Sequence, residues 1–113
     1  MAERRLPQAP PTRLFPAREG LRLDAGEERI EVYFPGPGHS PDNVVVWFSG
    51  KRILFGGCLV PVGMIGNRAD ADMGQWAQSL KNLSRFDPLW VVPGHGHRFD
   101  PGLLSDARKL LNR

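Results

Sequence analysis

The sequence is poor in cysteine and histidine. Its 113 residues contain one cysteine, Cys58, and three histidines, His39, His95 and His97. A single cysteine excludes a disulfide within the chain, so Cys58 is a buried thiol, a reactive thiol or a metal ligand. These four side chains are also the nitrogen and sulfur donors that zinc takes in proteins.

Long apolar runs are also absent. No stretch approaches the roughly 20 apolar residues that span a bilayer. The first residues are followed by prolines rather than by the apolar segment of a signal peptide. We therefore expect the chain, as given, to stay in the cytoplasm.

The charged residues are not gathered by sign. Lys and Arg number 15 and Asp and Glu number 12, and the two signs are interspersed along the chain. A protein that binds nucleic acid usually shows a basic stripe or basic residues interleaved with aromatic ones. We therefore expect no nucleic-acid partner and no membrane partner. The length is that of one small domain with a single core.

Short apolar segments bounded by turn residues predict a sheet. Residues 1–18 are rich in proline and are interpreted as a flexible tail, ahead of a folded unit at 19–113. The run at 43–48 is apolar at almost every position, as in a strand that is covered on both faces. The proline and glycine residues within 59–68 predict a loop there. The predicted strands, of which the first two form a hairpin, are 21–23, 30–34, 43–48, 52–55 and 89–92.

Two further segments have apolar residues at three- and four-residue intervals, which predicts amphipathic helices. The first starts near Met73 with Asp70 or Asp72 as its cap, and the second follows Asp100 and Pro101. Strands with two helices on one face make an α/β fold, half of a layered sandwich. No further segment is evident that would cover the opposite face of the sheet.

Three glycine-rich turns carry a metal-ligand side chain beside a predicted strand. His39 stands just before a strand, and Cys58 and His95 each stand just after one. Glycine lets the backbone turn sharply at a strand end, so such side chains can meet in a cleft beside the sheet. Each residue alone has a simpler interpretation, as a structural histidine or a small buried thiol. Together they predict one zinc site built across the sheet.

The same segments resemble a known family, the subclass B1 metallo-β-lactamases. The stretch 33–47 is similar to the region of their third zinc histidine, 53–60 to the zinc-cysteine segment and 91–96 to the last zinc-histidine segment. The order and the spacing agree from about residue 21 to about residue 111, which covers the C-terminal half of such an enzyme. The resemblance implies half of an αββα sandwich, with a mostly antiparallel or mixed sheet and two helices on one face.

The resemblance assigns His39 to a first Zn²⁺, and Cys58 and His95 to a second. The His-x-His-x-Asp motif that supplies the family's other ligands is absent from this sequence. A structural zinc takes four protein ligands and a catalytic zinc usually three plus water, so each site is incomplete within one chain. His97 matches no family ligand. It is either a surface side chain or the occupant of a vacant coordination position.

The expected substrate contacts match the family only in part. Asn67 corresponds to the asparagine that helps to polarise the lactam carbonyl, although its simpler interpretation is a turn or capping residue. The third position after the cysteine, often lysine in the family, is Pro61 here. Arg68 or Lys51 could supply the missing positive charge.

The resemblance therefore implies zinc-dependent hydrolysis of the β-lactam amide, provided that a partner supplies the missing ligands. We expect this partner to be a second copy of the chain, in a homodimer, or a separate N-terminal half, and activity to be weak or absent without it. The alternative is a non-catalytic zinc-binding or interaction module that kept the half-sandwich. Another hydrolase of the same fold is disfavoured, because the Gly-Gly-Cys segment suits the lactamases better. Enzymes of this family are normally exported, so a fragment of one would belong to the periplasm.

Overall fold

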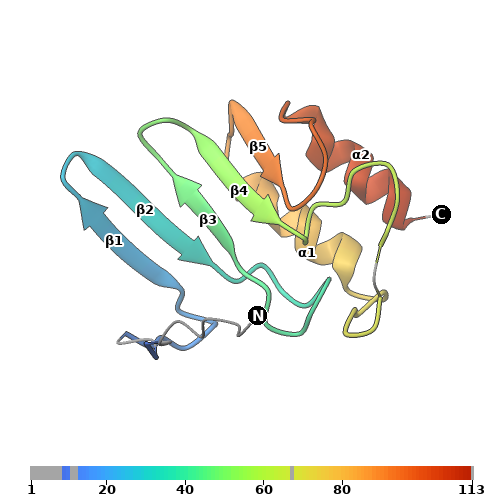
Figure 1. Ribbon diagram of the computed structural model, residues 1–113, viewed down its shortest axis with the longest axis horizontal. Coiled ribbons are helices and arrows are strands. Elements are labelled where there is room, and N and C mark those ends of the chain that lie inside the picture. The colour runs from blue at the N-terminus through green and yellow to red at the C-terminus, as the bar shows by residue number, and fades with distance from the viewer. Residues whose placement is uncertain (1–8, 11–12, 67, 113) are drawn as a thin grey trace, which may run out of the picture.

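The chain folds into a mixed five-stranded sheet with two helices (Figure 1). The computed structural model describes residues 9–10, 13–66 and 68–112. The strands lie side by side in sequence order, with β1 to β4 antiparallel and β5 parallel to β4. Helix α1 and the short 3₁₀ helix η1 form the crossover from β4 to β5. The elements are β1 Leu21–Ala25, β2 Glu28–Tyr33, β3 Val45–Phe48, β4 Ile53–Gly57, α1 Trp76–Asn82, η1 Leu83–Arg85, β5 Trp90–Pro93 and α2 Gly102–Leu111.

All the predicted strands are present, with one informative change of boundary. The strand predicted at 43–48 begins only at Val45. Asn43 is used otherwise, because its Nδ2 donates to the Gly36 carbonyl at 2.9 Å and its Oδ1 accepts from the Ser40 amide at 3.0 Å. A side chain that holds its own loop in this way ends the regular extended backbone.

Both predicted helices are present, and the first is shorter than its apolar pattern. Met73 lies in a turn ahead of α1 and is exposed, so it is not part of the buried stripe. Of the two predicted caps, Asp72 is the one that binds this turn, since its Oδ1 accepts from the Gln75 amide at 3.0 Å. Helix α2 starts one residue later than predicted, with Pro101 in the position before its first residue.

The hydrophobic core lies between the helices and one face of the sheet. Val45, Leu54 and Val91 project from β3, β4 and β5 into this core and are completely buried. Helix α1 passes behind β4 in the view of Figure 1 and contributes Trp76 and Leu80. The remaining members of the core are Leu59, Val60, Leu83, Phe86, Leu103 and Ala107.

The opposite face of the sheet, which we call the open face, is apolar on all five strands. The strand registers align its side chains in two rows. The rows are Leu21, Val32, Val46, Phe55 and Val92, and Leu23, Ile30, Phe48, Ile53 and Trp90. None of them is buried within the described part of the chain; Phe55 is 46% exposed and Trp90 56% exposed. The continuous apolar pattern of the strands thus predicted two covered faces, and the helices cover only one.

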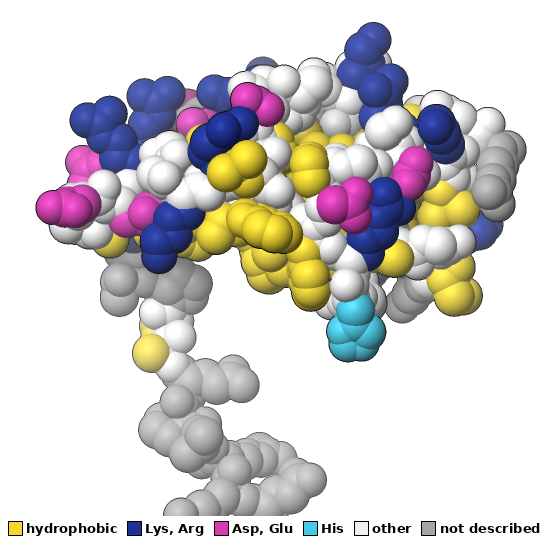
Figure 2. Space-filling view, turned by 90° about the horizontal axis from the view of Figure 1, so that it is seen from above, with side chains coloured by type: hydrophobic (Ala, Val, Ile, Leu, Met, Phe, Trp, Pro, Cys, Tyr) yellow, Lys and Arg dark blue, Asp and Glu magenta, His cyan; other side chains and the backbone are white. Residues whose placement is uncertain are grey.

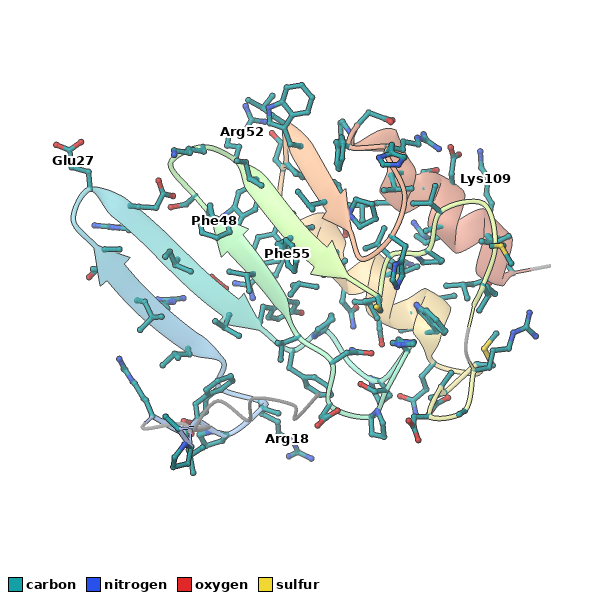
Figure 3. The ribbon with its side chains drawn as sticks, viewed as in Figure 1. Arg18, Glu27, Phe48, Arg52, Phe55 and Lys109 are labelled. Atoms are coloured by element: carbon teal, nitrogen blue, oxygen red, sulfur yellow. The ribbon has the colours of Figure 1, made fainter. Side chains whose placement is uncertain are left out.

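Figure 3 labels Phe48 and Phe55, which extend from neighbouring strands of the open face. Figure 2 shows hydrophobic side chains gathered in the middle of the molecule, with charged side chains to either side. No helix among the described residues is long and apolar enough to cross a membrane.

Candidate metal centre

The three predicted ligands, His39, Cys58 and His95, line one cavity of about 580 Å³. The cavity lies at one end of the sheet, where β2 ends, β3 begins, and β4 and β5 end. His39 comes from the loop between β2 and β3, Cys58 directly follows β4, and His95 follows β5. The topology therefore brings together three turns that are far apart in the sequence.

The loop that carries His39 is held by helix α1 and by its own side chains. The Ser79 hydroxyl donates to the Pro37 carbonyl at 2.6 Å, and the Asn82 amide group donates to the Pro35 carbonyl at 2.7 Å. In the segment just before α1, the Asp72 backbone N–H donates to the Gly38 carbonyl at 2.8 Å. Two side chains of α1 and one backbone N–H before it thus fix the backbone that leads to His39.

The turns that carry Cys58 and His95 are packed against each other through their backbones. The Gly94 N–H donates to the Gly57 carbonyl at 2.8 Å. A Cβ at position 94 would lie 2.8 Å from the Cys58 nitrogen and 2.9 Å from its Sγ. Only glycine fits there, because any side chain would displace the thiol or its backbone. The glycine next to His95 is therefore required by the position of the cysteine.

The segment after His95 is tied to helix α2 by Arg98. Its Nε lies 2.7 Å from the Asp100 carboxylate, and its Nη1 lies 2.6 Å from the Asp106 carboxylate. The hydrogen bond from Arg98 lowers the pKa of the Asp100 carboxyl below its ordinary value. His97 is exposed and does not line the cavity, which agrees with its interpretation as a surface side chain.

The side chains of His39, Cys58 and His95 are of the types that bind zinc, but they are too few to complete a zinc site. Two imidazoles and one thiol are ligands that zinc prefers. Within the described residues, however, no three His, Cys, Asp or Glu side chains stand close enough together to hold one metal ion. The resemblance assigns His39 to one zinc, and Cys58 and His95 to another. Their role as ligands remains a prediction.

The rest of the cavity wall is apolar. It consists of Val60, Pro61, Val62, Met64, Gly66, Trp76 and Gly96. Pro61 stands on this wall, where the resembled family often has lysine, and no Lys or Arg of the described chain lines it. Lys51 cannot replace that charge, because it lies in the β3–β4 turn at the other end of the sheet. Arg68 is exposed and is not part of the wall.

The sequence predicts a role in the site for Asn67 and none for Trp76. Asn67, predicted to help polarise a carbonyl, lies outside the described residues, although Gly66 before it lines the cavity. Trp76 belongs to the apolar stripe of the helix predicted near Met73, and that pattern indicates only burial. Its place on the cavity wall depends on the packing of α1 against the turns, which no spacing in the sequence encodes.

Comparison with known proteins places these observations in one family. The pattern of the Metallo-beta-lactamase superfamily matches residues 2–95. The Metallo-beta-lactamase type 2 of Bacillus cereus is 44% identical over 94 residues, which make up 79% of this chain and 37% of that protein. The Metallo-beta-lactamase type 2 of Pseudomonas aeruginosa is 41% identical over 81 residues, which make up 70% of this chain and 33% of that protein.

Solved structures agree with the sequence relatives. A metallo-beta-lactamase from Pontibacter korlensis superimposes with a TM-score of 0.79 and 42% identity, over 83% of this chain and 46% of that chain. The DIM-1 metallo-beta-lactamase gives a TM-score of 0.70 at 43% identity, over 74% of this chain and 41% of that chain. The chain thus spans less than half the length of each of these relatives.

The ion pairs of Arg98 generate a prediction about pH. Replacement of Arg98 by Gln should raise the pKa of Asp100 toward its ordinary value of 3.8. Because the folded-state pKa is lowered, the stabilisation by this pair is complete at neutral pH and is lost as the pH falls through the lowered pKa. NMR titration of the Asp100 carboxyl carbon in both proteins measures the shift. Equal pKa values in the wild type and the variant would contradict the pairing.

Proposed function

The chain belongs to the metallo-β-lactamase superfamily, and on that premise we propose that it is a zinc-binding half-domain of the subclass B1 type. The resemblance that the three turns predicted is confirmed, as is the half-sandwich fold with two helices on one face. The observation that carries the proposal is the single cavity lined by His39, Cys58 and His95.

The residues of this chain would contribute part of each metal site. His39 would serve one Zn²⁺, and Cys58 and His95 would serve a second. A bound zinc supplies Lewis-acid polarisation of a carbonyl and a nucleophile at neutral pH. The chain's own contribution is to hold these donors on backbones fixed by hydrogen bonds and to line the approach with apolar side chains. Asn67 remains the predicted donor to a developing oxyanion.

We propose that the completed protein hydrolyses a β-lactam amide. The support is the name of the relatives, metallo-beta-lactamase, together with the three matching ligand segments. The missing ligands would come from a partner. The alternative function, a non-catalytic zinc-binding or interaction module, is favoured by one observation: the described residues hold no complete metal-ligand group.

The open face supports a position for the proposed partner. Its ten apolar side chains form two continuous rows, and a large exposed apolar patch is typical of an interaction surface. Burial of such a surface is favourable by about 25 cal/mol per Å². A second copy related by a two-fold axis is the simplest closed arrangement, because the same face then serves both subunits. A separate N-terminal half is the other candidate.

The first test concerns metal binding. Cys58→Ala should lower the zinc affinity of the chain about tenfold or more, because it removes the only thiolate ligand. Zinc titration with a competing chelator measures the change. His97→Ala is the matched control, since His97 is exposed and does not line the cavity. Equal zinc affinity in the wild type and Cys58→Ala would contradict the assignment.

The second test concerns activity. The chain alone, with excess zinc, should hydrolyse a chromogenic cephalosporin weakly or undetectably. Metal catalysis requires a fixed coordination geometry, and a metal with missing ligands is held loosely. The assay is repeated with Cys58→Ala to separate the site from a contaminating activity. Robust turnover that survives this substitution would show that the proposed site is not responsible.

The third test concerns the partner. Wild-type chain at micromolar concentration should form a dimer, as measured by analytical ultracentrifugation, and Phe55→Lys should shift it to monomer. Phe55 projects from β4 on the open face, where a charge would have to be buried in the interface. Met73→Lys is the matched control, because Met73 is similarly exposed, at 39%, and lies in the turn before α1, outside both rows of the open face.

A wild-type chain that stays a monodisperse monomer, with a well-dispersed NMR spectrum and no partner, would contradict the need for a covering surface. Dimers that persist in Phe55→Lys and dissociate in Met73→Lys would place the interface elsewhere.

A further inference from the structure

One buried side chain, Trp76, touches both turns that carry the first two predicted ligands. It lies at the start of α1 and is 1% exposed. Its Nε1 donates to the carbonyl of Leu59, the residue after Cys58, at 2.7 Å. Its ring lies 5.9 Å from the His39 ring, centroid to centroid, at a tilt of 50°. The indole therefore stands between the two ligand turns.

The contact between these turns is close packed. A Cβ at position 38 would lie 2.5 Å from the Leu59 Cδ1 and 3.1 Å from the Trp76 Cδ1. Gly38, Leu59 and Trp76 thus leave no space between the His39 loop and the Cys58 turn. A single methyl group at this point would force the two turns apart or displace the indole.

The hydrogen bond of Trp76 adds direction to this packing. A buried carbonyl that loses its donor costs free energy, so the Leu59 carbonyl favours the one backbone orientation that reaches the indole N–H. Phenylalanine would fill much of the same space and could not donate. The N–H group therefore orients the Cys58 turn, whereas the ring alone would only fill the core.

The helix that carries Trp76 is already bound to the His39 loop. Ser79, Asn82 and the Asp72 backbone make the three bonds to that loop described above. On the other side, the Gly94 N–H joins the His95 turn to the Cys58 turn. Trp76 is thus the side chain that links a unit containing His39 to a unit containing Cys58 and His95.

We infer that Trp76 is a positioning residue for the metal centre: it sets the spacing between His39, on one predicted zinc, and Cys58 and His95, on the other. This inference rests on the proposed zinc-binding function. Trp76 is not itself a ligand, and it acts by holding the Leu59 carbonyl and the His39 ring in one arrangement. Substitution of a residue that orients metal ligands typically lowers the metal affinity by about 10- to 100-fold.

The test compares two Trp→Phe substitutions. Trp76→Phe should lower the zinc affinity about tenfold or more, in the range given for residues that support metal ligands. Trp47→Phe is the matched control. Trp47 is partly buried and packs against Phe86, with the two ring centroids 5.0 Å apart, and it does not line the cavity. It should change the affinity less than twofold. Co²⁺ substitution gives a second readout, since the thiolate-to-cobalt absorption reports the geometry at Cys58.

A second measurement uses the metal-free protein. Amide hydrogen exchange in Trp76→Phe should accelerate at residues 57–60 and 38–40 and stay unchanged in α2. A general loss of stability would instead accelerate exchange throughout. Gly38→Ala should produce the same local pattern from the other side of the contact. Gly50→Ala is the control, because the atoms nearest to a Cβ at position 50 belong to the flexible side chain of Glu28.

The outcomes separate this inference from the proposed function. If the wild type binds no zinc, the proposed function fails, and the exchange pattern of the metal-free variants still decides the role of Trp76. If the wild type binds zinc and Trp76→Phe binds it equally, with unchanged exchange in both turns, the inference is wrong. If Trp76→Phe does not fold, the zinc affinity and exchange of Gly38→Ala decide the matter in the same way.

Discussion

The packing of helix α1 against one face of the sheet is the contact on which the rest of the structure depends. Trp76 and Leu80 of the helix share a core with Val45, Leu54 and Val91 of the sheet. The helix is the crossover between β4 and β5, so this contact also makes those two strands parallel and brings their ends to the same edge. A parallel pair requires such a covered crossover. The edge that results carries the cavity.

The proposed metal centre depends on backbone hydrogen bonding as much as on ligand chemistry. None of the three predicted ligands belongs to a helix or a strand. Each stands in a turn whose backbone is hydrogen-bonded to α1, to Trp76 or to a neighbouring turn. Sites on loops are precise only when their support is rigid. Much of that support comes from helix α1, which explains why a core residue and a site residue can be the same tryptophan.

The open face and the incomplete ligand set have one physical origin. A sheet whose strands are apolar on both faces needs two covering layers, and two helices provide one. The chain spans less than half the length of its relatives. Under the proposed function, one partner would supply both the second covering layer and the remaining donors.

The sequence by itself determined the element order, the strand pairs of the hairpin, the two helices and the family, because periodicity, glycine-bounded turns and the three ligand segments are all local. It also placed His39, Cys58 and His95 at strand ends, which the structure gathers around one cavity. It did not locate the start of β3 at Val45 instead of Asn43, the exclusion of Met73 from α1 or the distance of Lys51 from the site. Only the three-dimensional structure decided these, since they depend on the loop that the Asn43 side chain holds, on where α1 begins and on which end of the sheet carries each turn. The same holds for Trp76: an apolar stripe predicts burial, whereas its bond to Leu59 and its contact with His39 arise only when the helix packs beside both turns.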